Sequence, residues 1–191
     1  SCHAALTALT QSRPGQAGAA VALFDHEEVG SESSRGAAST LLPAVLERLG
    51  TVLGLDAQDR ARALDASFMV SADMAHAVHP SHADLHDPGH AVRVNGGPVI
   101  KTNASQRYAT EALSGARFRT LCERAGVPCQ EYTHRADLHC GTTVGPLLAA
   151  RLGVRAVDAG NPMWAMHSAR ESAGAHDGAA LTAALTALFS E

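Results

Sequence analysis

The fold of this chain is decided by the stretch Val21-Ala22-Leu23-Phe24-Asp25-His26-Glu27-Glu28-Val29-Gly30-Ser31-Glu32-Ser33. An apolar run of β-forming residues stops at charged residues and a glycine, and a serine-rich segment follows, which predicts a strand, a turn and a helix. Active sites in open α/β sheets lie beyond such carboxyl strand ends. Of two adjacent carboxylates there, one can bind a metal while the other takes a proton from water. Glu27 and Glu28 are therefore candidates for this chemistry, and an acidic, solvated turn is the alternative.

Composition limits the classes of protein to consider. The 191 residues, 46% of them hydrophobic, are enough for one domain with a sizeable core. A net charge of −4 without a long basic run argues against nucleic acid as a partner. No apolar stretch reaches the roughly 18 residues of a membrane span, so no membrane association is expected. Cys2, Cys122, Cys129 and Cys140 lack CxxC spacing, which favours reduced, mostly buried thiols in a cytoplasmic protein.

Apolar periodicity predicts strands that alternate with helices, and hence a layered α/β sandwich. Helices are predicted over Ser1–Thr10, from a cap at Ser33 or Ser34 to Gly50, and over Leu55–Leu64, Thr110–Ala125, Thr142–Leu152 and His176–Phe189. Strands are predicted over Ala19–Phe24, Ser67–Ala72, Pro98–Thr102, Val127–Tyr132 and Arg155–Ala159. Loops are predicted over Gln11–Gly18 and Met74–Gly97.

The long predicted loop is rich in histidine. His82, His86 and His90 recur every fourth residue, as metal ligands on one helical face would. Pro80 and Pro88 interrupt any such helix, so these side chains are interpreted as loop histidines. The chain contains 11 histidines in all, a number that makes a metal site plausible without locating it.

The opening stretch closely resembles the metal-binding segment of the aspartyl aminopeptidases, the M18 family of dinuclear zinc peptidases. Further segments match the family in the same order along the chain. They are Ser71-Ala72-Asp73-Met74-Ala75-His76-Ala77-Val78-His79-Pro80, Gly97-Pro98-Val99-Ile100-Lys101, Cys140-Gly141-Thr142-Thr143-Val144-Gly145-Pro146 and Ala165-Met166-His167-Ser168-Ala169-Arg170-Glu171. Ordered matches over nearly the whole chain are a far stronger signal than any one alone.

The resemblance implies a three-layer α/β/α sandwich of the dinuclear zinc aminopeptidase type, incomplete at its N-terminal side. Residues 1–191 are then expected to be the C-terminal part of the metallopeptidase catalytic domain, with the upstream segment and an oligomerisation domain absent. Relatives assemble into homo-oligomeric dodecamers, so a homo-oligomer is expected.

The resemblance also assigns roles at the metal centre. It implies Glu27 as the general base, Glu28 and His167 as ligands of one Zn²⁺ ion, and Asp73 as a ligand of a second. Imidazole and carboxylate are the ligand types that catalytic zinc uses. Without the resemblance, Asp73 would be interpreted as a turn-forming residue and His167 as a hydrogen-bonded core histidine.

Substrate contacts are implied at three further positions. Lys101 is the only lysine of the chain, and as a compact cation it could bind an acidic substrate side chain. The family pattern supports that role and implies selection for peptides with an N-terminal Asp or Glu. Tyr108 and His79 match residues that contact the substrate, and His76 is a weaker candidate.

Two departures leave the function open. The family's centre also uses a histidine from an upstream His-x-Asp segment and a bridging aspartate, and neither can be assigned in this chain. The expected function is metal-dependent release of acidic N-terminal residues. The alternatives are a noncatalytic scaffold with an incomplete metal site, and a related dinuclear zinc hydrolase with another substrate.

Overall fold

The computed structural model describes residues 1–13 and 15–191. Pro14, which belongs to the predicted loop Gln11–Gly18, lies outside the described residues. Among the residues that are described, no helix is long and apolar enough to cross a membrane.

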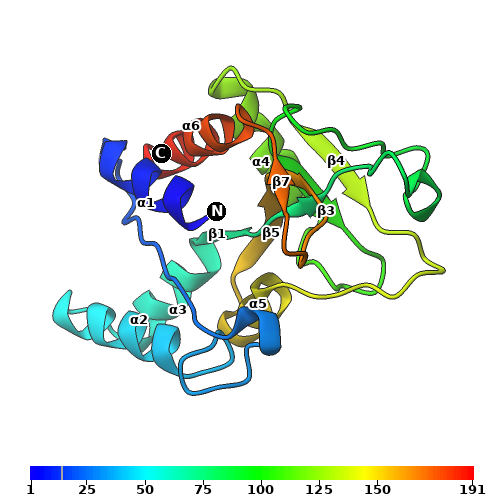
Figure 1. Ribbon diagram of the computed structural model, residues 1–191. Helices are drawn as coiled ribbons and strands as arrows, with labels where there is room; N and C mark the ends of the chain where they lie inside the picture. The colour runs from blue at the N-terminus through cyan, green and yellow to red at the C-terminus, as the bar shows by residue number, and fades with distance from the viewer. Residues whose placement is uncertain (14) are drawn as a thin grey trace.

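A mixed sheet of four strands forms the centre of the fold (Figure 1). Its order is β1 (Phe68–Ala72), β5 (Arg155–Gly160), β3 (Val99–Thr102), β4 (Gln130–Thr133). The pairs β1–β5 and β3–β4 are parallel, whereas β3 runs antiparallel to β5. Residues in the middle of β3 and β5 are buried, because neighbours pair with both edges of these strands and helices cover the sheet.

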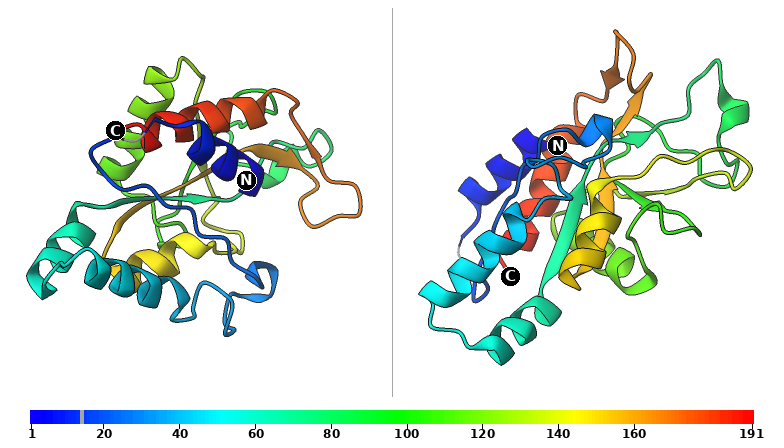
Figure 2. Two further views of the ribbon diagram at one scale, coloured as in Figure 1. Left: turned by 90° about the vertical axis from the view of Figure 1, so that its left-hand side faces the viewer. Right: turned by 90° about the horizontal axis from the view of Figure 1, so that it is seen from below.

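Helices lie on both sides of this sheet, which gives the expected α/β/α layers (Figure 2). One layer contains α4 (Ala112–Arg124), α6 (Asp177–Phe189) and α1 (Cys2–Gln11), which pack on one another. The other contains α5 (Val144–Leu152), which packs on β5 and β1, with α2 (Leu41–Val52) and α3 (Ala57–Ala66) farther out. Local signals fix these helices: Asp56 caps α3 by accepting from Asp59 N at 2.8 Å, and Gly153 ends α5 at φ 66°.

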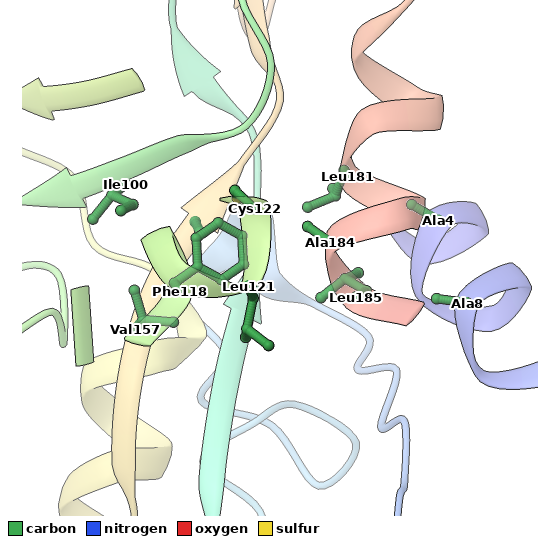
Figure 3. Close-up of a cluster of buried hydrophobic side chains, with 11 residues drawn as sticks. Ala4, Ala8, Ile100, Phe118, Leu121, Cys122, Val157, Leu181, Ala184 and Leu185 are labelled. Atoms are coloured by element: carbon green, nitrogen blue, oxygen red, sulfur yellow. The ribbon is translucent and has the colours of Figure 1, made fainter. Parts of the chain in front are cut away.

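The main core lies between the sheet and the α4/α6/α1 layer (Figure 3). Phe118 and Leu121 of α4 meet Val157 of β5 there, and Leu181 and Leu185 of α6 close the cluster. Alanines of α1 and α6 let these two helices approach closely. A second cluster, which includes Val99, Tyr108, Tyr132 and Cys140, lies beyond the strands and borders the site described below. The four cysteines are free thiols, and two of them are buried.

The segment Met74–Gly97 is mostly loop, as predicted, but contains the short strand β2 (Ala75–His76) and the 3₁₀ helix η2 (Ala83–Leu85). β2 pairs with β6 (Pro162–Trp164), and β6 pairs with β7 (Ser172–Ala173). This small sheet was not predicted, because strands of two or three residues leave no periodic pattern.

The predicted strand Ala19–Phe24 is wrong. The segment is extended but pairs with no strand of the described chain, and Leu23 is 49% exposed. β-forming residues favour an extended backbone locally, but a strand also needs a neighbour to accept its hydrogen bonds.

The predicted start of the next helix is also wrong. The Ser33 hydroxyl accepts from Gly36 N at 3.0 Å, so it closes a turn instead of capping a helix, and α2 begins only at Leu41. This helix was expected to pack on the sheet through its apolar face. Instead Leu41, Val45 and Leu49 are 50%, 44% and 49% exposed.

Candidate active site

Glu27 and Glu28 lie on the 3₁₀ helix η1 (Glu27–Val29), which follows the segment Ala19–Phe24. His26 precedes η1 in the left-handed conformation at φ 61°, and Gly30 follows it at φ 99°. The His26 ring is held by a 2.7 Å hydrogen bond between Nδ1 and Ser33 Oγ. This tight turn places the two adjacent carboxylates at the same cleft.

His167 joins Glu28 from the other end of the chain, since its Nε2 lies 2.8 Å from Glu28 Oε2. His167 has φ 67°, and its backbone N–H donates to Glu171 Oε1 at 2.7 Å. A non-glycine residue in this region costs about 1 kcal/mol, and such conformations cluster at functional sites. The Glu171 carboxylate therefore helps to hold His167 in the conformation that brings its ring to Glu28.

Asp73 and Lys101 form the opposite side of the site. Asp73 directly follows β1, and its Oδ2 lies 3.1 Å from the Nζ of Lys101, a residue of β3 that is 1% exposed. Nζ also donates to the carbonyl of Met74 at 3.0 Å and lies 5.1 Å from the centre of the Tyr108 ring. Asp73 packs against β5 so closely that a Cβ at Gly160 would come within 1.6 Å of the Asp73 carbonyl oxygen.

These two sides face one cleft of about 1090 Å³. Six of the residues assigned a site role from the sequence line it, namely Glu27, Glu28, Asp73, Lys101, Tyr108 and His167, and so does the weaker candidate His76. Partial burial raises the pKa of Glu27 above its usual value, and the nearby carboxylates of Asp73 and Glu28 add to the increase. Lys101 and His167 oppose it. A carboxylate with a raised pKa is a better proton acceptor near neutral pH.

The donor groups are of the kinds that bind zinc, namely carboxylates and an imidazole. Glu28 and His167 supply one close pair, and Asp73 supplies a carboxylate across the same cleft. Within residues 1–13 and 15–191, no group of three or more His, Cys, Asp or Glu residues is placed so that it could hold a metal ion. The donor types therefore suit zinc, but the described residues supply only a pair on one side of the cleft and a single carboxylate on the other.

His79 is the predicted site residue that the structure leaves outside the cleft lining. Its ring centre lies 5.4 Å from that of His82 and 6.5 Å from that of Trp164, and its Nδ1 accepts from Ser81 N at 3.2 Å. Its contact with substrate stays a prediction.

Sequence reasoning missed several residues of the cleft. His134 lines it, and its Nδ1 lies 2.7 Å from the hydroxyl of Tyr132. Gln106 and Arg107, which precede Tyr108, and Thr142, which lies in the matching segment Cys140–Pro146, also line it, although no site role was assigned to them. Asp158 lies behind the lining. A charged residue within the apolar run of β5 was a signal that could have identified it.

The structure thus has a mixed α/β sandwich with carboxylates, a histidine and a buried lysine around one cleft. The family model described as "Aminopeptidase I zinc metalloprotease (M18)" matches residues 1–189. The chain belongs to the M18 family of peptidases.

Relatives agree with this assignment. The chain is 52% identical over 190 residues to a probable M18 family aminopeptidase 2 of Mycobacterium leprae, covering 100% of this chain and 45% of that protein. Its fold matches the M18 aminopeptidase of Thermotoga maritima with a TM-score of 0.87 at 28% identity, over 98% of this chain and 43% of that one. The mApe1 dodecamer of S. cerevisiae matches with a TM-score of 0.76 at 27% identity, over 87% and 36%. The chain thus spans less than half the length of these relatives.

Proposed function

We propose that this chain forms the C-terminal part of the catalytic domain of an aminopeptidase that releases Asp or Glu from the N-terminus of peptides. The observation that carries the proposal is the placement of Lys101. Its ammonium group is buried beside Asp73 and the Tyr108 ring, in the same cleft as Glu27, Glu28 and His167. Family membership supports the peptidase chemistry, and the buried cation supports an acidic substrate.

The reaction assigns a separate task to each side of the cleft. Glu28 and His167 would hold one zinc ion and Asp73 a second. Bound zinc supplies a lowered pKa for the attacking water and polarises the scissile carbonyl. Glu27 accepts the proton of the water on its carboxylate and then donates it to the departing amine. The raised pKa of Glu27 suits both transfers, since a base must release the proton again.

Lys101 has the chemistry to select the substrate. Among the described residues, its Nζ donates to Asp73 Oδ2 at 3.1 Å and to the Met74 carbonyl at 3.0 Å and to no other acceptor, so it retains a third donor. Little water reaches it, and a carboxylate that binds beside it gains more from the charge than it would in bulk solvent. Tyr108 lies against the same ammonium group and lines the cleft, so its hydroxyl is the second proposed substrate contact.

Assembly and location extend the proposal. Because the S. cerevisiae relative is a dodecamer, we expect the protein that contains this chain to form a homo-oligomer. His79, which lies away from the cleft of its own chain, is expected to contact substrate only in such an assembly. We also propose a cytoplasmic location, which the free thiols support.

A noncatalytic scaffold is the second candidate, and the divided donor set favours it for this chain alone. In the described part of the chain, the zinc-binding side chains form a pair and a separate carboxylate, without a cluster of three. Zinc binding that appears only when the chain is extended upstream would reconcile this observation with the peptidase proposal.

The deciding experiment measures zinc content and the hydrolysis of an aspartyl amide and a leucyl amide. This chain and a version extended upstream as in the relatives are compared, with Glu27→Gln as the control for chemistry and Lys101→Met for selectivity. We expect the extended protein to bind zinc, to prefer the aspartyl amide, and to lose activity on both substrates with Glu27→Gln. A zinc-loaded extended protein that prefers the leucyl amide would leave the fold assignment intact and refute the acidic substrate.

A further inference from the structure

Asp158 is a buried carboxylate that the proposed reaction does not use. It lies on β5, is 0% exposed, and accepts three hydrogen bonds of 2.6 Å. The donors are the hydroxyls of Ser71 and Thr143 and the backbone N–H of Ala109. All three donors are uncharged, and the Asp158 carboxyl group is buried among them. Such burial costs free energy unless every acceptor site is used.

Each donor belongs to a different wall of the cleft. Ser71 lies on β1, two residues before Asp73, and pairs with Asp158 in the β1–β5 register. Ala109 directly follows Tyr108, and Thr143 precedes the first turn of α5 and lines the cleft. A Cβ at Gly145 would come within 2.3 Å of Asp158 Oδ2, so this turn of α5 lies directly against the carboxylate. One side chain thus ties together three segments that are far apart in the sequence.

Asp158 also lies on the strand that pairs with β3, the strand of the lysine that we assign to substrate selection. In the antiparallel β3–β5 pair, Ile100 stands opposite Ala159. Lys101 is the next residue of β3 after Ile100, and Asp158 is the residue of β5 before Ala159. The Tyr108 ring, 5.1 Å from Lys101 Nζ, is held in place by the adjacent Ala109 N–H bond to Asp158.

We propose that Asp158 is a positioning residue for substrate selection. Its hydrogen bond from Ala109 fixes the neighbouring Tyr108, and its hydrogen bond from Ser71 fixes the nearby Asp73. These two contacts together set the position of the Lys101 ammonium group between Tyr108 and Asp73. It touches neither substrate nor metal. The inference rests on the proposed role of Lys101 as the group that binds the acidic side chain. Its consequence is that losing Asp158 lowers the preference for acidic over neutral N-termini.

The test measures kcat/KM for an aspartyl and a leucyl amide on the same sample of the native, zinc-loaded polypeptide. Their ratio does not depend on the fraction of folded enzyme, so a merely structural defect leaves it unchanged. Asp158→Ser, whose hydroxyl is too short to reach all three donors, should lower the ratio at least about tenfold, because small displacements of a binding group cost that much. Asp158→Asn should keep it within about threefold, since the amide oxygen can accept from Ala109 N–H and the amide N–H₂ can face both hydroxyls.

Asp177 offers a matched control. It is also a buried aspartate, 1% exposed, and accepts from the backbone N–H groups of Asn95 and Gly97 at 2.7 and 2.9 Å, but it does not line the cleft. Asp177→Ser should lower thermal stability and leave the substrate ratio unchanged. Equal ratios for Asp158→Ser and Asp177→Ser would overturn the proposal.

A double-mutant cycle identifies the route of the effect. In a Tyr108→Leu background the ring that Asp158 positions is gone and only the route through Ser71 and Asp73 remains, so Asp158→Ser should change the ratio less than it does in the wild type. An undiminished effect in that background would overturn the route through Tyr108. If Asp158→Ser yields no folded protein, Ser71→Ala, which removes one donor and keeps the other two, should still lower the ratio. A wild-type enzyme without acidic preference refutes the proposed function and this inference together, whereas a preference that survives all Asp158 variants refutes only the inference.

Discussion

The two sides of the cleft are built in different ways. Lys101 and Asp73 come from strands of the central sheet or directly follow one, and their side chains are 2% and 41% exposed. Glu28 and His167 come from a 3₁₀ helix and a loop, and their side chains are 71% and 65% exposed. Most of the non-glycine residues with positive φ lie on this second side, at His26, Ser31, Ala165 and His167.

The difference separates substrate selection from metal binding. The sheet fixes Lys101 before any ligand arrives, so this side is preorganised and contributes to the stability of the fold. The loop side, formed by Glu28 and His167, holds these two proposed ligands near one another at the cost of local backbone strain. A bound cation would neutralise the exposed Glu28 carboxylate. We expect mutations on the sheet side to change stability and selectivity, and mutations on the loop side to change zinc affinity.

The largest expected effect belongs to Glu27, which lies between the two sides. Glu27→Gln keeps the shape of the side chain and removes the proton acceptor, so kcat on any substrate should fall by about 10³-fold. Steady-state kinetics with equal zinc loading provide the measurement. Retention of more than a tenth of the activity would mean that another group accepts the proton.

The next largest effect should be a loss of zinc affinity in variants of the loop side. Glu28→Gln and His167→Asn each replace one proposed ligand, and each should weaken zinc binding by at least about a hundredfold in a protein with a complete site. Without zinc, the free energy of unfolding of each variant should lie within about 0.5 kcal/mol of the wild-type value, because these side chains are exposed. Competition with a chelating dye and chemical denaturation test the two statements separately.

Lys101→Met, in contrast to the two ligand variants, should lower the stability of the fold. It removes two hydrogen bonds of a buried ammonium group, and because Asp73 is partly solvated we expect a loss of about 2 kcal/mol in the free energy of unfolding. The matched control is Arg62→Met, which breaks an exposed ion pair with Asp59 and should cost less than about 0.5 kcal/mol. Equal free energies of unfolding for Lys101→Met and Arg62→Met would contradict the interpretation that the side of the cleft formed by Lys101 and Asp73 is preorganised.

The smallest expected effect concerns pH. The pKa of Glu27 is raised in the folded state by burial and by Asp73 and Glu28, so the folded state binds more protons than the unfolded state just above the usual value of 4.5. The stability that Glu27 contributes therefore falls as pH rises from 4.5 through its folded pKa. Glu27→Gln should raise Tm slightly at pH 7 and leave it unchanged at pH 4. A Tm difference that is the same at both pH values would contradict this prediction.

Much of this arrangement follows from sequence, and the remainder has identifiable causes. The family resemblance selected Glu28, Asp73 and His167, and all three line one cleft, although their roles as zinc ligands stay a prediction. The strand predicted over Ala19–Phe24 failed because a strand depends on a partner that its own residues do not encode. Asp158 was missed because its three donors lie 15, 49 and 87 residues away, and only the folded sheet brings them together.

Two glycines limit how this cleft can be engineered. Gly160 leaves no space for a side chain beside the Asp73 carbonyl, and Gly145 leaves none beside the Asp158 carboxylate. A library that randomises the cleft to obtain a new substrate preference should therefore hold both positions constant. Diversity is better placed at Gln106, Arg107 and His134, which line the cleft and can change shape without displacing the sheet.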